Sequence, residues 1–132
     1  MAAQAELSGE LARLRAAVPQ LTGSLVVGPD GKVLAEDFDG QAAPQLGART
    51  ADSLAAVYRL AEAAALGGAH ELLIRGERGW LAAHTAGEKA ALMLVTQPGA
   101  NIGRLRLEAD WSGARIGELL DGAPERLEKT NP

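Results

Sequence analysis

The chain has 132 residues, the usual size of a single domain and long enough to enclose one hydrophobic core. Hydrophobic residues make up 47% and charged residues 23%, which excludes the disordered and collagen-like classes. The net charge of −4 argues against nucleic acid as a partner, because that affinity depends on clustered Lys and Arg. No apolar run approaches the ~20 residues that span a bilayer, and the absence of cysteine excludes disulfides and thiolate metal sites. We therefore expect a cytoplasmic protein without membrane insertion.

A helix followed by a β-hairpin is predicted at the start of the chain. Over residues 4–18, apolar side chains recur every three or four residues and form one stripe: Leu7, Leu11, Leu14 and Val18. Pro19 ends this helix. Residues 22–27 and 32–38 resemble strands, and Gly28-Pro29-Asp30-Gly31 between them favours a tight turn, because proline presets one dihedral and glycine accepts a positive φ.

A long second helix is predicted over residues 44–66, with Gly67-Gly68 as its C-cap. One side of this helix is expected to meet the sheet: Leu46, Thr50, Ser53, Val57, Leu60 and Ala64, widened by Leu54, Ala61 and Ala65. The opposite side has few bulky side chains, so that another helix could approach it closely: Ala51, Asp52, Ala55, Ala56, Arg59, Glu62, Ala63 and Leu66.

Three strands and a last helix complete the predicted order. The strands cover residues 71–75, 80–85 and 90–96, and the third is almost continuously apolar, as expected of a central strand covered on both faces. Asn101 can cap the last helix, whose apolar stripe is Ile102, Leu105, Ala109, Ser112, Ile116 and Leu120. We predict a single domain over residues 1–120 and a polar, flexible C-terminal tail over residues 121–132.

This order of elements, together with three sequence features, resembles the roadblock family of dynein light chains, in its prokaryotic, MglB-like branch of GTPase regulators. The first feature is the run from Leu21 to Ala35, and the second is the alanine-rich helix ending in Gly67-Gly68. The third is the run from Ala91 to Gly103, where a last strand and a short polar turn precede a glycine in the first helical turn. The resemblance spans about residues 7–120.

The resemblance implies an α/β (α+β) fold of roadblock/profilin-like type, α-β-β-α-β-β-β-α. Its five-stranded antiparallel sheet would have the order 2-1-5-4-3, with one helix on one face and two on the other. It also implies a bacterial homodimer that serves as a platform for a small Ras-like GTPase and has no catalytic residues or cofactor of its own.

Two groups of residues are candidates for contacts with partners. If the second helix and the edge strand of residues 71–75 pair with their own copies, the dimer interface comprises Ala51, Asp52, Ala55, Ala56, Arg59, Glu62, Leu72 and Ile74. Trp111 lies opposite the apolar stripe of the last helix, with Leu107 nearby, so these two residues are a candidate partner contact, and packing against the first helix is the alternative. Trp80 is expected to pack in the core or on the sheet.

The motifs of common catalytic sites are missing. The candidate phosphate loop, Gly28-Pro29-Asp30-Gly31-Lys32-Val33, lacks the spacing and the hydroxyl of a P-loop, and no dinucleotide or nucleophile-elbow motif occurs. The acidic run Glu36-Asp37-Phe38-Asp39-Gly40 does not complete a calcium loop. A metal site that joins His70 and His84 is conceivable, but two unconnected strand histidines are the simpler interpretation.

Three functions are therefore distinguished. The first is a homodimeric regulator or scaffold that binds a Ras-like GTPase and senses or modulates its nucleotide state. The second is a structural adaptor that tethers partners without sensing nucleotide. The third is a small-ligand sensor, which the filled interior expected from Leu92, Leu94 and the alanine-rich helices disfavours.

Overall fold

A computed structural model describes residues 2–38 and 43–130. The elements in chain order are α1 (Ala2–Ala17), β1 (Leu21–Val27), β2 (Val33–Asp37), α2 (Ala43–Ala63), β3 (Glu71–Gly76), β4 (Gly79–Ala86), β5 (Ala90–Thr96) and α3 (Ile102–Thr130). All eight elements predicted from the sequence are present in the predicted order. None of the described helices is long and apolar enough to cross a membrane.

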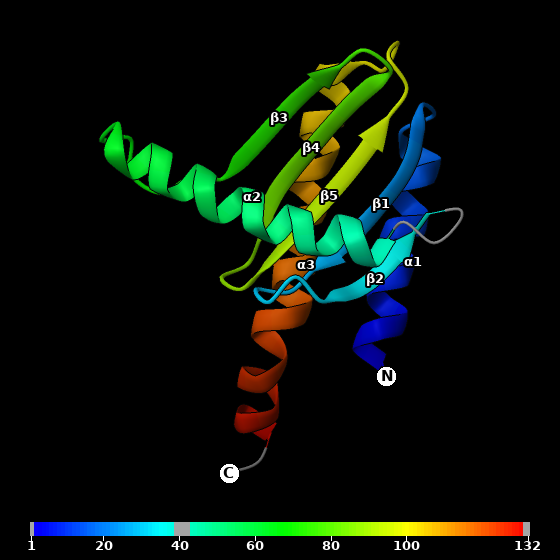
Figure 1. Cartoon of the computed structure of the whole chain (residues 1–132). Coiled ribbons are helices and arrows are strands. Elements are labelled where there is room, and N and C mark those ends of the chain that lie inside the picture. Colours follow the sequence, from blue (N-terminus) through cyan, green and yellow to red (C-terminus); the bar gives the residue numbers. More distant parts are fainter. Residues whose placement is uncertain (1, 39–42, 131–132) are drawn as a thin grey trace.

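The five strands form one antiparallel sheet in the order β2-β1-β5-β4-β3, as the family resemblance implies. Helix α2 crosses one face of this sheet, and α1 and α3 cover the other (Figure 1). Strand β5 is central and buried on both faces, since Leu92 and Leu94 join the core beneath α1 and α3 while Met93 joins the core beneath α2. The continuous apolar run of this strand is thereby explained.

Helix α1 uses the predicted stripe, and Leu7, Leu11, Leu14 and Val18 are all buried. Helix α3 approaches the sheet unusually closely because glycines face it. A Cβ on Gly113 would lie 2.9 Å from the carbonyl oxygen of Thr85, and one on Gly117 would lie 2.6 Å from the amide nitrogen of Gly87. The helix continues to Thr130, beyond Leu120 where its apolar stripe ends. The division into residues 1–120 and a flexible tail stays a prediction.

The sheet-facing side of α2 differs from the prediction. Its buried residues are Ala43, Gly47, Thr50, Leu54 and Ala61, whereas Ser53, Leu60 and Ala64 are exposed. Ala51 was expected on the outer side but is half-buried and packs against the core. The reason is that α2 packs mainly over β1 and β2 with its N-terminal half, so the sheet does not lie beneath its C-terminal half. Figure 1 shows this green end of α2 reaching past the edge strand β3.

The C-cap of α2 also differs from the prediction of Gly67-Gly68. The residue in the left-handed region that ends the helix is Ala65, with φ of 59°. The amide of Leu66 donates to the carbonyl of Ala61 at 2.9 Å, and the amide of Ala65 donates to the carbonyl of Glu62 at 3.0 Å. This pair of hydrogen bonds is a Schellman motif with alanine at the position that glycine usually occupies.

Candidate interaction surfaces

The predicted dimer-interface residues lie on the α2 side of the sheet. On α2, Asp52, Ala55, Ala56, Arg59 and Glu62 are exposed. On β3, Leu72 is half-buried against the α2 core and Ile74 is exposed. The structure therefore brings this set together on one side of the molecule, with Ala51 directed toward the sheet.

Two apolar features on this side were missed by the sequence analysis. Leu60 lies on the overhanging end of α2 and Leu66 follows directly after the helix, and these two side chains are 70% and 76% exposed. The part of the sheet that α2 does not cover has a hollow of about 290 Å³, whose apolar lining includes Ile74, Leu81 and Val95. The periodicity of apolar residues identifies one side of a helix. It does not show whether the sheet of the same chain extends far enough to bury the whole length of that side.

The two edges of the sheet differ in how their backbone groups are satisfied. At the β2 edge, Gln4 Nε2 donates to the carbonyl of Leu34 at 3.1 Å. Arg15 closes the end of the β1–β2 ladder, where one guanidinium nitrogen donates to the carbonyls of Thr22 and Asp37 at 3.3 and 3.1 Å. Arg15 also pairs with the Asp37 carboxylate at 2.6 Å. Among the described residues, no side chain donates a comparable hydrogen bond to the backbone of β3. The β3 edge is therefore the one that offers its backbone to another strand.

The opposite face of the molecule presents Leu107 and Trp111 of α3, which are 67% and 57% exposed. The Trp111 indole lies between two guanidinium groups, with Arg13 at 5.1 Å and Arg115 at 5.7 Å from the ring centroid. Trp111 therefore packs against Arg13 of α1, as in the alternative interpretation, and still exposes more than half of its surface, so its role as a partner contact stays a prediction. Trp80, by contrast, is half-buried beside Arg75 on the sheet.

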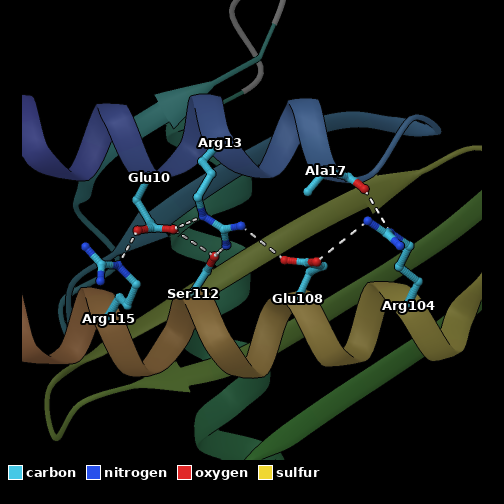
Figure 2. A network of polar contacts seen from close by, with 7 residues as sticks. All are labelled: Glu10, Arg13, Ala17, Arg104, Glu108, Ser112 and Arg115. Carbon is cyan, nitrogen blue, oxygen red and sulfur yellow. Dashed lines mark hydrogen bonds and ion pairs between the residues drawn. The ribbon is translucent and has the colours of Figure 1, made fainter.

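A buried carboxylate holds the two arginines that flank Trp111 (Figure 2). The Glu10 side chain accepts hydrogen bonds from Arg13 at 2.6 Å, from Arg115 at 2.9 Å and from Ser112 at 3.1 Å. Burial alone would raise the pKa of Glu10, but these three hydrogen bonds outweigh it and hold the pKa below its ordinary value. Glu10 therefore stays ionised and joins α1 to α3.

The same network continues along α3 toward its N-terminus. Arg13 donates to Ser112 at 2.6 Å and pairs with Glu108 at 3.2 Å. Arg104 donates to the carbonyl of Ala17 at 3.0 Å and lies 3.9 Å from Glu108 (Figure 2). Sequence periodicity could not reveal this network, because it connects residues about a hundred positions apart.

A second polar cluster ties α3 to the edge strand β3. Arg106 donates two hydrogen bonds to the Glu71 carboxylate, at 2.5 and 2.8 Å, and these are the main reason that the pKa of Glu71 lies below its ordinary value. The buried His84 of β4 lies beneath α3, with Nδ1 3.1 Å from Asp110 and Nε2 3.6 Å from Glu71. The cluster fixes the start of β3 against the rest of the fold.

The suspected chemical sites take other roles in the structure. In the β1–β2 turn, the amide of Gly31 donates to the carbonyl of Gly28, and the amide of Gly28 donates to the carbonyl of Lys32. The amide of Lys32 donates to the Asp30 carboxylate, so these three amides are already engaged. Since Glu71 pairs with His84 across β3 and β4, His84 faces α3 while His70 belongs to the other face. The described residues contain no cluster that could hold a metal ion. Glu36 and Asp37 belong to β2, and Asp39-Gly40 lies outside the described residues.

The fold and sequence both have known counterparts. The chain is 33% identical over 97 residues to the uncharacterized protein MJ1340 of Methanocaldococcus jannaschii, covering 73% of this chain and 84% of that protein. The gliding protein MglB of Thermus thermophilus superposes with a TM-score of 0.86 at 23% identity, covering 93% and 94% of the two chains. A structure described as MglB with tetrameric arrangement gives the same TM-score and identity and covers 93% of each chain. The sequence pattern of the Roadblock/LC7 domain matches residues 7–96, and the chain belongs to the Roadblock/LC7 family.

Proposed function

We propose that this protein is a non-catalytic, cytoplasmic homodimer that binds a small Ras-like GTPase and couples or modulates its nucleotide state. Membership of the Roadblock/LC7 family and the fold shared with MglB support a regulatory role. The GTPase as partner follows from the resemblance to prokaryotic GTPase regulators. An adaptor that tethers partners without sensing nucleotide is the alternative that the experiments below separate.

The dimer begins with the open edge of β3. If this strand pairs antiparallel with its own copy, a two-fold axis relates the subunits and one sheet continues through both of them. The contact removes the unpaired backbone groups of both edges at once. The β2 edge, where Gln4 of α1 occupies the carbonyl of Leu34, is the poorer candidate for such pairing.

The overhang of α2 is the structural observation that carries the proposed dimer. Antiparallel pairing of the β3 strands inverts one subunit relative to the other along the strand direction. The end of each α2 that passes its own edge strand would then lie over the half of the other sheet that is not covered by a helix. Leu60 and Leu66 would be buried against the hollow that Ile74, Leu81 and Val95 line in the second copy.

Binding experiments with both nucleotide states test the GTPase assignment. The immobilised dimer is incubated with each Ras-like GTPase of the source organism, beginning with any encoded beside this protein, loaded with GDP or with a non-hydrolysable GTP analogue. We expect one GTPase to be retained in one nucleotide state. Equal retention in both states supports the adaptor, and failure of every GTPase to bind in either state contradicts the proposal.

The protein itself is expected to bind neither GTP nor ATP. The amides of Gly28, Gly31 and Lys32 are engaged within the hairpin, and no P-loop hydroxyl follows Lys32. Calorimetry with each nucleotide and Mg²⁺ should show no stoichiometric heat. Hydrolysis that appears only when the GTPase is added would be assigned to the GTPase, whereas stoichiometric nucleotide binding by the chain alone would refute the non-catalytic assignment.

A further inference from the structure

The α1–α3 face carries a hollow beside an exposed aromatic residue. This hollow of about 410 Å³ is lined by Arg13, Leu107, Glu108 and Trp111. Leu107 and Trp111 are adjacent on the outer side of α3, about one turn apart, and together they form an apolar pair of the kind that anchors interfaces. The surface has room for one large apolar side chain of a partner.

The charges around this hollow are arranged by depth. The side chains of Arg13, Arg104 and Arg115 are 36%, 57% and 53% exposed. The side chains of Glu10 and Glu108, which pair with them, are only 5% and 18% exposed. Within this network the arginines lie nearer to solvent than the carboxylates that pair with them, so a molecule that enters the hollow meets positive charge first.

We propose that this surface binds an acidic polypeptide segment with one large apolar side chain. The apolar side chain fills the hollow against Leu107 and Trp111, and Asp or Glu residues on either side of it pair with Arg13, Arg104 and Arg115. Arginine suits this role because its planar group binds a carboxylate through two hydrogen bonds and also stacks on an indole. The surface is formed by α1 and α3, on the opposite side of the sheet from α2.

Glu10 acts in this surface as a positioning residue. Its two carboxylate oxygens hold Arg13 and Arg115 at the distances from which both guanidiniums flank Trp111. The indole is thereby fixed before a partner arrives, which lowers the entropic cost of binding. Glu10 itself is buried and does not contact the bound segment.

Selection from a library of displayed random dodecapeptides tests the chemistry of the partner. The library is panned on the purified wild-type protein and depleted on the Trp111→Ala variant. The enriched peptides should be rich in Asp and Glu around one Leu, Ile, Phe or Trp. Enrichment of basic or uncharged peptides, or no enrichment over the depleted pool, overturns the proposal. The selection uses only this protein, so its outcome does not depend on whether a GTPase binds.

Affinity measurements then assign the contacts to residues. For the most enriched peptide, Trp111→Ala and Arg104→Ala should each weaken binding about tenfold or more. Arg78→Ala removes an exposed arginine from the β3–β4 turn, far from the hollow, and should leave the affinity unchanged. Added salt should weaken binding to the wild type more than binding to Arg104→Ala. Equal effects of Arg78→Ala and Arg104→Ala would show that net charge alone attracts the peptide.

A fluorescence readout isolates the role of Glu10. In a Trp80→Phe background Trp111 is the only tryptophan, so its anisotropy reports the mobility of this one indole. Glu10→Gln should lower the anisotropy of Trp111 and weaken peptide binding, while the far-ultraviolet circular dichroism spectrum stays unchanged. Unaltered anisotropy with unaltered affinity would remove Glu10 from the proposal. Single-stranded DNA and anionic vesicles serve as competitors, and displacement of the peptide by either at equal charge concentration would refute a polypeptide-specific surface.

Discussion

At the scale of single residues, Ala65 adopts a left-handed backbone conformation that glycine would adopt at lower cost. Its φ of 59° closes the Schellman motif of α2, and this conformation costs an L-residue about 1–2 kcal/mol that glycine avoids. Ala65→Gly should therefore raise the free energy of unfolding, by about 0.5–1 kcal/mol after the greater freedom of glycine in the unfolded chain is subtracted. Urea unfolding monitored by circular dichroism measures the difference.

The same substitution nearby provides the matched control. Ala63 is the last residue of α2 and has no positive φ, so Ala63→Gly should destabilise the protein by up to about 1 kcal/mol. If both variants lose stability equally, the left-handed strain at Ala65 contributes nothing. Glycine is the usual cap residue, so the sequence predicts the cap at Gly67-Gly68. Only the backbone hydrogen bonds of Ala65 and Leu66 show that the cap is Ala65.

At the scale of elements, the packing of α1 on α3 should depend on pH through Glu10. Its pKa lies below the ordinary value of 4.5, so the network stabilises the folded state fully above that value and loses this contribution as pH falls through the pKa of the folded state. Glu10→Gln should cost about 2 kcal/mol at neutral pH, the scale of charged hydrogen bonds. The difference between wild type and variant should shrink in acid, as measured by urea unfolding across the pH range.

Glu6→Gln is the control for this comparison, because Glu6 is exposed on the same helix. It should change stability by less than about 0.5 kcal/mol at any pH. If the stability difference between Glu10→Gln and the wild type did not change with pH, side-chain packing and not charge would hold α1 against α3.

The sequence located α1, α3 and their apolar stripes, but not the polar network between them. The stripe Leu7, Leu11 and Leu14 is a local pattern, which fixes the buried side of α1 without reference to any other element. Glu10 meets Arg115 only because α1 and α3 lie side by side on the sheet, and no local signal reports that proximity. Trp111 was found as a candidate because its exposure follows from the same local periodicity.

At the scale of the whole molecule, the proposed dimer predicts the effect of a bulky charge on α2. Ala55→Arg should weaken dimerisation by about 3 kcal/mol or more, since the contact would bury an unmatched charge and a large side chain. Light scattering at micromolar concentration should show a wild-type dimer and a predominantly monomeric variant. Ala114→Arg adds the same group to α3 on the opposite face and should remain dimeric.

A wild-type monomer would contradict the proposed dimer, and normal dimers of Ala55→Arg would mean that the interface lies elsewhere. The order of strands was predicted only through the family resemblance, because spacing alone cannot tell that β1 lies next to β5. The overhang of α2 was beyond prediction for a similar reason. Val57 and Leu60 share the expected stripe, but the stripe does not say whether the sheet beneath them belongs to the same chain.

In the proposed dimer, the hydrogen bond from Gln4 to the Leu34 carbonyl and the ion pair of Arg15 with Asp37 at the end of β2 give each subunit a valence of one for sheet growth, that is, one open edge. A subunit with two open edges would polymerise, whereas a subunit with one open edge terminates the assembly at a pair. Replacing both Gln4 and Arg15 with alanine should therefore raise the valence to two and produce thioflavin-positive fibrils. Ala55→Arg leaves the β2 edge unchanged and should form no fibrils. If the double variant stays a dimer, the carboxylates of Glu36 and Asp37 suffice to close that edge. In this proposal, two side chains of α1 set the stoichiometry of an interface formed at the far edge of the sheet.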